Sequence, residues 1–404
     1  MNDLQGVNYL PEPTDRNMVS AVDASVVDHE SGWRSEVMGW APQEVRPVGH
    51  ARRSTVTAGT LLLSVLMVAL GLFAWQNQWY VIELPLPDSE WAFETTDIRR
   101  LQDMGLTGEG VRLCMVDTGI DAQHEAFSSA SIDFQDLVGG SLDPVDYGTV
   151  AHGTLMSGLM LSTTHQIGVA PNVTFAMVAA LSSGEGDENS GSDDDVADAI
   201  RWCQFEFQAD IISLSLGGES AGVGEREGAS SSATRQATDA GVYVIAAAGN
   251  DGGPDDDGDV ASPGSVRLAI SVGATDRDAT VWSNSSQGDA MGMNGSPRDA
   301  PHQKPEVVAP GQAIVSTGES NRWYSSSGTS DSTVFVAGSL ALILESYPHL
   351  KPQPSGNSSC LEHVKEALMT SSQGDSNQGH DPRNGYGLLN AVGWHNALSN
   401  IEQC

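Results

Sequence analysis

The chain has 404 residues, with 53 acidic side chains against 19 lysines and arginines and a formal net charge of −34. This length suits one large domain with accessory segments, and so negative a chain repels nucleic acid, which excludes nucleic-acid binding. Its 44 glycines cluster with Ser and Asp between short apolar runs, a texture typical of an α/β protein with many loops.

The N-terminal part of the chain predicts a membrane anchor. Residues 1–55 are polar without periodicity, so we expect a disordered cytoplasmic tail. Residues 56–75 carry no charge and are long enough to cross a hydrocarbon core of about 30 Å. Because Arg34, Arg46, Arg52 and Arg53 precede this run, the positive-inside rule puts the N-terminus in the cytoplasm and the remainder outside.

Two other interpretations of the apolar run are a cleaved signal peptide and a buried core helix. The run exceeds the usual apolar region of a signal peptide, and no A-x-A-like cleavage site follows it. We therefore expect a single-pass protein of the cell membrane, with a linker over residues 76–95 and a folded domain over residues 96–404.

Strand and helix patterns alternate in this domain. The expected buried strands, rich in β-branched residues, are 111–117, 174–181, 210–216, 242–249 and 268–274. The expected helices are 152–162, 195–208 and 228–240. This alternation predicts an α/β fold with a mostly parallel sheet and helices on both faces. Reactive groups are then expected at the carboxyl ends of the strands.

An aspartate and a histidine occupy such positions. Asp117 ends the apolar run VRLCMV, where a carboxylate can orient an imidazole, although many strand-end aspartates only cap turns. An aspartic protease would need a second DTG or DSG sequence, which the chain lacks. His152 opens the apolar segment HGTLMSGLML, and an imidazole is the usual general base for a serine hydroxyl.

An asparagine and a serine complete the candidate set. Asn250 follows the strand pattern VYVIAAAG, where an amide serves either as a turn residue or as a donor to an oxyanion. Ser330 lies where a glycine-rich turn meets the apolar run VFVAGSLALIL. A helix that begins there would direct its N–H groups at the reacting centre, and the alternative is a serine N-cap on a core helix.

Five segments in this order resemble the subtilisin-like serine proteases, over about residues 96–395. They are VDTGID (116–121), HGT (152–154), SLSLGG (213–218), AAAGN (246–250) and GTSDSTVFVAG (328–338). The resemblance implies a serine endopeptidase that cleaves polypeptides through an acyl-enzyme on Ser330, with His152 as general base and Asp117 orienting it. It also implies that Asn250 and the Ser330 N–H hold the oxyanion, and that the chemistry needs no cofactor.

The resemblance further implies where a substrate binds. The matching segments contain Ser215, Leu216, Gly217 and Gly218, with Gly184 in the edge segment SSGEGD at residues 182–187.

One departure from the family concerns the residues after the nucleophile. Where the family usually has Met-Ala-Thr-Pro, this chain has Asp331, Ser332, Thr333 and Val334. Because Asp331 adds a negative charge beside Ser330, the alternative function is a surface binding protein of the same fold with impaired catalysis. A non-peptidase α/β-hydrolase is disfavoured, since Ser330 lacks a G-x-S-x-G motif.

Cysteines and acidic loops give two further expectations. Cys114 and Cys203 lie in apolar segments and are predicted as free core thiols. A disulfide between Cys360 and Cys404 is a hypothesis, which a location outside the cytoplasm would permit. The acidic stretches 191–195 and 254–259 either carry solvated charge or bind a structural Ca²⁺. The sequence identifies no metal ligand.

Overall fold

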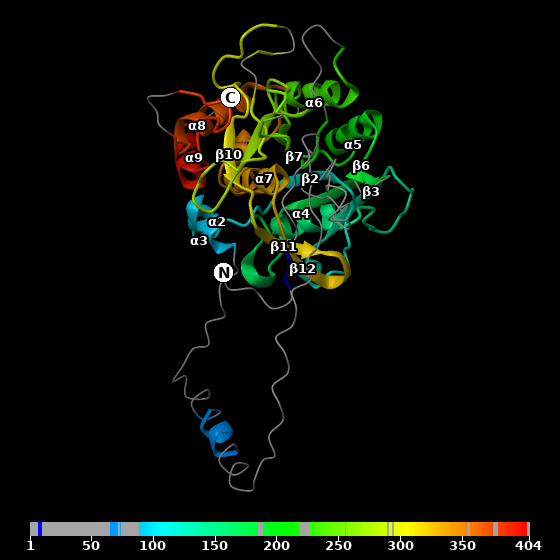
Figure 1. Ribbon diagram of the computed structural model, residues 1–404, viewed down its shortest axis with the longest axis vertical. Coiled ribbons are helices and arrows are strands. Elements are labelled where there is room, and N and C mark those ends of the chain that lie inside the picture. The colour runs from blue at the N-terminus through cyan, green and yellow to red at the C-terminus, as the bar shows by residue number, and fades with distance from the viewer. Residues whose placement is uncertain are drawn as a thin grey trace.

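A seven-stranded sheet runs through the centre of the domain, in the order β10-β9-β8-β7-β2-β4-β3, and every strand pair in it is parallel (Figure 1). Its strands are β2 (Arg112–Asp117), β3 (Ile132–Asp136), β4 (Thr174–Ala179), β7 (Ile211–Leu214), β8 (Tyr243–Ala247), β9 (Ile270–Thr275) and β10 (Val307–Pro310). The predicted parallel α/β fold is confirmed.

This computed structural model describes residues 7–9, 65–71, 73, 89–184, 189–218, 226–254, 256–288, 291–292, 295–353, 356–374 and 379–401. Among these residues, no helix is both long enough and apolar enough to cross a membrane. Within the predicted span 56–75, residues 65–71 are helical and expose Val65, Leu66, Met67, Val68 and Leu70. Most of the predicted cytoplasmic tail lies outside the described residues.

Helices cover both faces of the sheet. On one face lie α5 (Asp193–Phe205) and α6 (Ala229–Asp239), and on the other lie α4 (His152–Leu161) and α7 (Thr329–Ser346). Strand β2 divides its side chains between the two cores: Leu113 and Met115 pack on the α4 and α7 side, whereas Cys114 and Val116 pack on the α5 side. This alternation follows from the two-residue period of a strand.

The five strands and three helices predicted from the sequence are confirmed, with boundaries shifted by up to three residues. Strands β3 and β10 were not predicted. β3 is an edge strand with the polar pattern IDFQD, and its side chains are only partly buried. β10 has four residues and ends in Pro310, so it lacks the length of a typical strand signal.

Smaller elements surround the main sheet. The remaining described elements are α2 (Glu90–Thr95), α3 (Ile98–Asp103), β5 (Ser182–Ser183), β6 (Asn189–Ser190), β11 (Ile314–Gly318), β12 (Arg322–Ser326), α8 (Ser359–Ser371), α9 (Ala391–Leu398) and four 3₁₀ turns. Helix α2 falls within the segment predicted as a linker, yet it buries Trp91 and Phe93 in the core. The packed part of the domain therefore includes α2.

Strand β1 (Val7–Tyr9) pairs in parallel with β12, with Val7 opposite Trp323 and Tyr9 opposite Ser325. Strand β12 also pairs with β11 in antiparallel orientation, and it leads through a short turn into α7. A segment from the N-terminal part of the chain thus lies against the strand that precedes Ser330.

The prediction that Cys114 and Cys203 are free thiols is wrong. The two residues form a disulfide between β2 and α5, although both are fully buried as expected. The alternation of β2 explains this outcome, because it directs Cys114 toward the face that α5 covers. Cys360 is also disulfide-bonded, and its predicted partner Cys404 lies outside the described residues.

Candidate active site

The candidate residues come from different elements that meet at the carboxyl edge of the sheet. Asp117 is the last residue of β2, Ser215 follows β7, and Asn250 follows β8. His152 is the first residue of α4 and Ser330 the second residue of α7. Parallel strands end at one common edge, so the sheet gathers groups that are far apart in the sequence.

A carboxylate–imidazole pair forms the centre of this site. His152 Nδ1 lies 2.7 Å from Asp117 Oδ1, and both side chains are completely buried. The same Oδ1 accepts a hydrogen bond from the Thr118 N–H. No described residue forms a hydrogen bond with His152 Nε2. The carboxylate therefore orients the ring and leaves its second nitrogen available for proton transfer.

Two glycines allow this close approach. Gly119 follows Asp117 and Thr118 with a φ of +115°, in the left-handed region that favours glycine. A Cβ atom on Gly153 would lie 2.0 Å from the Gly119 carbonyl oxygen. Any larger residue at position 153 would push the start of α4 away from the end of β2 and separate His152 from Asp117.

Ser330 lies in the first turn of α7, whose N–H groups have no partners within the helix. Its hydroxyl donates to the Ser215 carbonyl oxygen at 3.2 Å, and the Ser215 hydroxyl donates to the Ser330 carbonyl oxygen at 3.1 Å. The Ser330 hydroxyl therefore does not bond His152 Nε2 in this structure. In enzymes without bound substrate, catalytic hydrogen bonds are often long and tighten only in the reactive complex.

Asn250 is held beside the start of α7. Its Oδ1 accepts hydrogen bonds from the Thr329 N–H at 2.9 Å and the Thr329 hydroxyl at 3.0 Å. These bonds fix the amide plane, while Nδ2 is buried and has no hydrogen-bond partner among the residues that the structure describes. An unsatisfied buried donor next to the residue before Ser330 is suited to receive an oxyanion.

Asp331, which departs from the family pattern, is completely buried. Its Oδ1 accepts a hydrogen bond of 2.6 Å from the Ser326 hydroxyl, and its Oδ2 has no partner in the described part of the chain. Burial raises the pKa of Asp331 to about 8, against the opposing effect of the Ser326 bond. At neutral pH this side chain is therefore an uncharged carboxylic acid, and the predicted negative charge beside Ser330 is absent.

Sequence reasoning missed Asp146, which connects the two halves of the carboxylate–imidazole pair. Its Oδ1 accepts from the Thr118 hydroxyl at 2.7 Å, and its Oδ2 accepts from the Thr154 hydroxyl at 2.6 Å. Burial raises the pKa of Asp146, and these hydrogen bonds oppose the rise. Nothing in its loop sequence SLDPVDYG marks it, because its role depends on two distant segments.

The predicted substrate-binding residues flank the end of β2. Leu216 is buried, while Gly217 is half-buried and Gly218 exposed where they follow β7. On the other side, Gly184 is exposed and follows β5. Strands β7 and β4 are the two neighbours of β2, so these segments lie on either side of the candidate catalytic pair.

The acidic stretch at residues 254–259 is part of a carboxylate cluster. Oxygens of Asp251, Asp256 and Asp257 lie within 4.8 Å of one another. Burial, with smaller contributions from the two neighbouring carboxylates, raises the pKa of Asp251 to about 6. Hard oxygen donors of this kind suit Ca²⁺. In the other stretch, Asp193 instead accepts backbone hydrogen bonds from the start of α6.

A parallel α/β sheet that carries a carboxylate–imidazole pair, a helix-start serine and an amide donor at one edge is the arrangement expected of a serine-nucleophile hydrolase. Comparison with known proteins identifies the family. The profile of the Subtilase family matches residues 108–394, and the chain belongs to this family. It is a serine-type endopeptidase, as the resemblance predicted.

Three relatives illustrate the similarity. Serine protease AprX of Bacillus subtilis (strain 168) is 32% identical over 311 residues, which cover 71% of this chain and 66% of the relative. Subtilisin DY of Bacillus licheniformis is 33% identical over 262 residues, or 62% and 82% of the two chains. Alkaline elastase YaB of Bacillus sp. (strain YaB) is 31% identical over 308 residues, or 74% and 68%.

Proposed function

We propose that the chain hydrolyses peptide bonds in polypeptides with Ser330 as nucleophile, His152 as general base, Asp117 as its orienting carboxylate and Asn250 as oxyanion donor. The observation that carries this proposal is the buried Asp117–His152 bond of 2.7 Å, which leaves Nε2 without a partner among the described residues. The orphaned Asn250 Nδ2 beside the start of α7 supports the oxyanion role.

The reaction begins when the Ser330 hydroxyl leaves the Ser215 carbonyl and turns toward His152. Its oxygen attacks the peptide carbonyl carbon while Nε2 takes the hydroxyl proton, and the carbonyl oxygen becomes an oxyanion held by Asn250 Nδ2 and the Ser330 N–H. His152 then gives the proton to the leaving nitrogen as the C–N bond breaks. Water attacks the acyl-enzyme by the same steps and restores Ser330.

Substrate binding is proposed for the segments on both sides of β2. Ser215, Leu216, Gly217 and Gly218 would line one side of the extended chain, and Gly184 would lie on the other. Backbone donors and acceptors at these positions suit pairing with an added strand.

A fluorophosphonate probe tests the mechanism, because it reacts with an activated serine hydroxyl. We expect labelling of the native protein and none in Ser330→Ala or His152→Ala. Ser332→Ala is the matched control: this serine lies in the same helix turn but donates to the Ala309 carbonyl, so labelling should persist. Labelling that survives both active-site changes would refute these roles. A folded native protein that resists labelling would favour the catalytically impaired binding protein.

We also propose that the catalytic domain works outside the cytoplasm, anchored to the cell membrane through residues 56–75. The Cys114–Cys203 disulfide supports an oxidising compartment. The β1–β12 pairing opposes the single-pass topology, because Val7–Tyr9 and the domain would lie on opposite sides of the membrane.

Tags at the two ends of the chain separate these possibilities. With a spanning segment, external protease removes the C-terminal tag from intact cells and leaves the N-terminal tag protected. Digestion of both tags would refute the proposed topology, and recovery of the chain in the soluble fraction would refute the anchor.

Calcium is proposed only as a structural ion, since subtilases need no cofactor for the chemistry. The hard oxygens of Asp251, Asp256 and Asp257 would hold it. Calcium should then raise the Tm of the native protein but not of Asp257→Asn, and equal Tm values with calcium and with EDTA would contradict this.

A further inference from the structure

A short turn, residues 145–147, lies against the segment that follows the candidate catalytic carboxylate. Asp146 forms an antiparallel bridge with Gly119, and the Tyr147 N–H donates to the Thr118 carbonyl oxygen at 2.8 Å. Thr118 and Gly119 come directly after the end of β2. The backbone of this turn is therefore fixed relative to the carboxylate that orients the imidazole.

The same turn contacts the predicted substrate edge. The Tyr147 carbonyl oxygen accepts a hydrogen bond of 2.9 Å from the Ser183 N–H. Ser183 belongs to β5, which pairs with β6 over only two residues, and both Ser183 and Gly184 are exposed. So short a hairpin is marginally stable by itself, so its position depends on contacts with its neighbours. Tyr147 supplies one such contact, from the side of the catalytic pair.

The Tyr147 side chain is held from the main sheet. Its hydroxyl donates to Asp136 Oδ2 at 2.6 Å. Asp136 is the last residue of β3 and is 7% exposed. Its carboxylate also accepts the N–H groups of Val138, Gly139 and Ser141 at 2.5–2.9 Å. Hydrogen bonds to a charged acceptor are among the stronger ones in proteins, so this carboxylate is a firm anchor for the hydroxyl.

The ionisation of this pair does not change near neutral pH. The hydrogen bond to Asp136 raises the pKa of Tyr147 to about 12. Burial acts to raise the pKa of Asp136, but the bonds from Tyr147 and from the three N–H groups outweigh it and lower this pKa. A neutral phenol therefore faces a carboxylate throughout the neutral range, and the bond between them persists.

We propose that Tyr147 is a positioning residue for substrate binding. Asp136 holds its hydroxyl, and its backbone then keeps the edge at Ser183 and Gly184 in register with Asp117. This inference rests on the proposed function, because it assigns the group that sets the binding edge of that site. Tyr147 acts through the edge and not on the reacting atoms, so its loss should weaken substrate binding and leave the chemical step unchanged.

Steady-state kinetics of Tyr147→Phe with two substrates tests this role. Both are p-nitroanilides with the same last residue: one is a tetrapeptide that can pair with the edge, and the other is that residue alone, acetylated. For the tetrapeptide, KM should rise roughly tenfold with kcat near the native value, the lower end of the range for losing a hydrogen bond to a charged group. The shorter substrate should show native kinetics, because it does not reach the edge.

Gly139→Ala is a second, independent variant. A Cβ atom on Gly139 would lie 2.3 Å from the Tyr147 hydroxyl oxygen, so this change displaces the hydroxyl from Asp136 without removing either group. It should raise KM for the tetrapeptide as Tyr147→Phe does, and again leave the shorter substrate unaffected.

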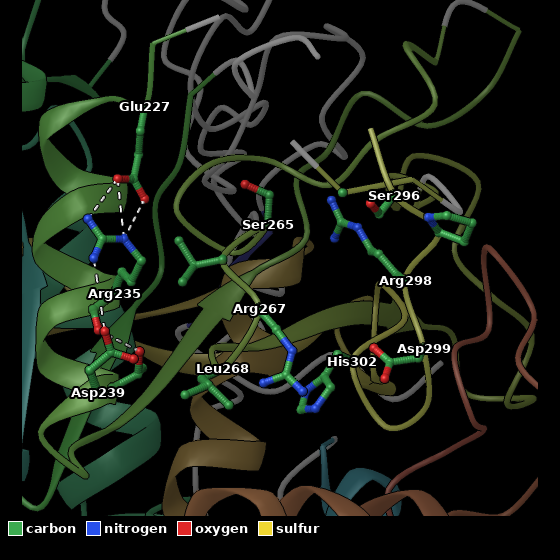
Figure 2. Close-up of a pocket in the computed structure, with 14 residues that line it drawn as sticks. Glu227, Arg235, Asp239, Ser265, Arg267, Leu268, Ser296, Arg298, Asp299 and His302 are labelled. Atoms are coloured by element: carbon green, nitrogen blue, oxygen red, sulfur yellow. Dashed lines mark hydrogen bonds and ion pairs between the residues drawn. The ribbon is translucent and has the colours of Figure 1, made fainter. Parts of the chain in front are cut away.

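Two controls lie toward the other end of the sheet. Tyr386 is half-buried like Tyr147, and its hydroxyl donates to Gln303 Oε1 at 3.1 Å. Arg267 lies on the wall of a pocket of about 720 Å³ (Figure 2) and donates to Glu362 at 2.8 Å. Tyr386→Phe and Arg267→Gln lose a tyrosine hydroxyl bond and a carboxylate bond, respectively, so both should retain the native KM for both substrates.

Fluorophosphonate labelling separates this inference from the proposed function. Tyr147→Phe should be labelled as the native protein is, since Ser330 and His152 are unchanged. A native KM for the tetrapeptide in Tyr147→Phe and Gly139→Ala, or an equal rise for both substrates, would overturn the positioning role alone. A tenfold rise in either control would do the same. Absence of labelling in the folded native protein would overturn the proposed function, and this inference with it.

Discussion

At the scale of single residues, Asn250 has one free group and therefore one testable role. Asn250→Ala should lower kcat roughly 100- to 1,000-fold with little change in KM, because the oxyanion forms only after substrate binds. That magnitude is the known cost of removing one oxyanion donor from a subtilisin, which is a member of the same family. Steady-state kinetics on a peptide substrate measures it.

Thr329→Ser is the control for this experiment, since it keeps both donors that hold the Asn250 carbonyl oxygen. It should retain nearly full kcat. A rise in KM with unchanged kcat in Asn250→Ala would show that Asn250 binds substrate and does not stabilise the oxyanion.

The ionisation of Asp331 predicts how the kcat/KM of this protein depends on pH. Its carboxyl group is neutral below a pKa of about 8 and ionises above it, next to Ser330. A negative charge there opposes the developing oxyanion, so kcat/KM of the native protein should fall as pH rises above about 8. Asp331→Asn carries no such charge and should be about tenfold more active than the native protein at pH 9.

The same group gives a stability readout with a defined sign. Between its ordinary pKa of 3.8 and about 8, Asp331 is protonated when folded and ionised when unfolded. The folded state then binds more protons, so the Asp331 contribution to stability declines as pH rises through this window. Asp331→Asn should flatten that decline in a Tm series. Identical alkaline limbs in the two kinetic profiles, together with identical slopes of Tm between pH 3.8 and about 8, would refute this account.

At the scale of elements, the disulfide ties the strand that carries Asp117 to α5 across a sequence separation of 89 residues. Cys114→Ala/Cys203→Ala should lower the free energy of unfolding by about 2–4 kcal/mol, while kcat at 25 °C stays near the native value. Denaturant titration measures this loss. Cys114 and Cys203 are completely buried, so Leu113→Ala serves as a control for core truncation without loss of a covalent bond.

An unchanged denaturation midpoint and slope in the double cysteine variant would contradict this expectation. A loss that appears equally in the presence of reductant, which breaks the native bond as well, would show that lost packing is responsible and not the covalent link.

The strands β2, β4, β7, β8 and β9 could be predicted from the sequence, because each is a short apolar run bounded by turn residues. The positions of Asp117, His152, Asn250 and Ser330 follow from these boundaries, since each lies where an element begins or ends. The disulfide could not be predicted in this way: it depends on which face of β2 receives α5. Asp146 escapes prediction for the same reason, because its hydrogen bonds join Thr118, which follows β2, to Thr154 in the first turn of α4.

At the scale of the whole molecule, the excess of acid over base decides how substrates approach. Arginines such as Arg99, Arg235 and Arg322 are paired with Glu90, Glu227 and Glu319 at 2.6–3.0 Å. Each ion pair joins one positive and one negative side chain, so pairing leaves the net charge at −34, and this charge acts over long range.

This field should favour cationic substrates through faster encounter. Two peptides with the same scissile sequence, one flanked by lysines and one by glutamates, should differ roughly tenfold in kcat/KM at low salt. The ratio should approach one near 1 M NaCl, where the screening length is about 3 Å. A peptide flanked by serines controls for salt effects on the enzyme itself and should lie between the two. If the ratio persists at high salt, the preference comes from direct contacts in the binding segments, and the acidic surface acts only on solubility.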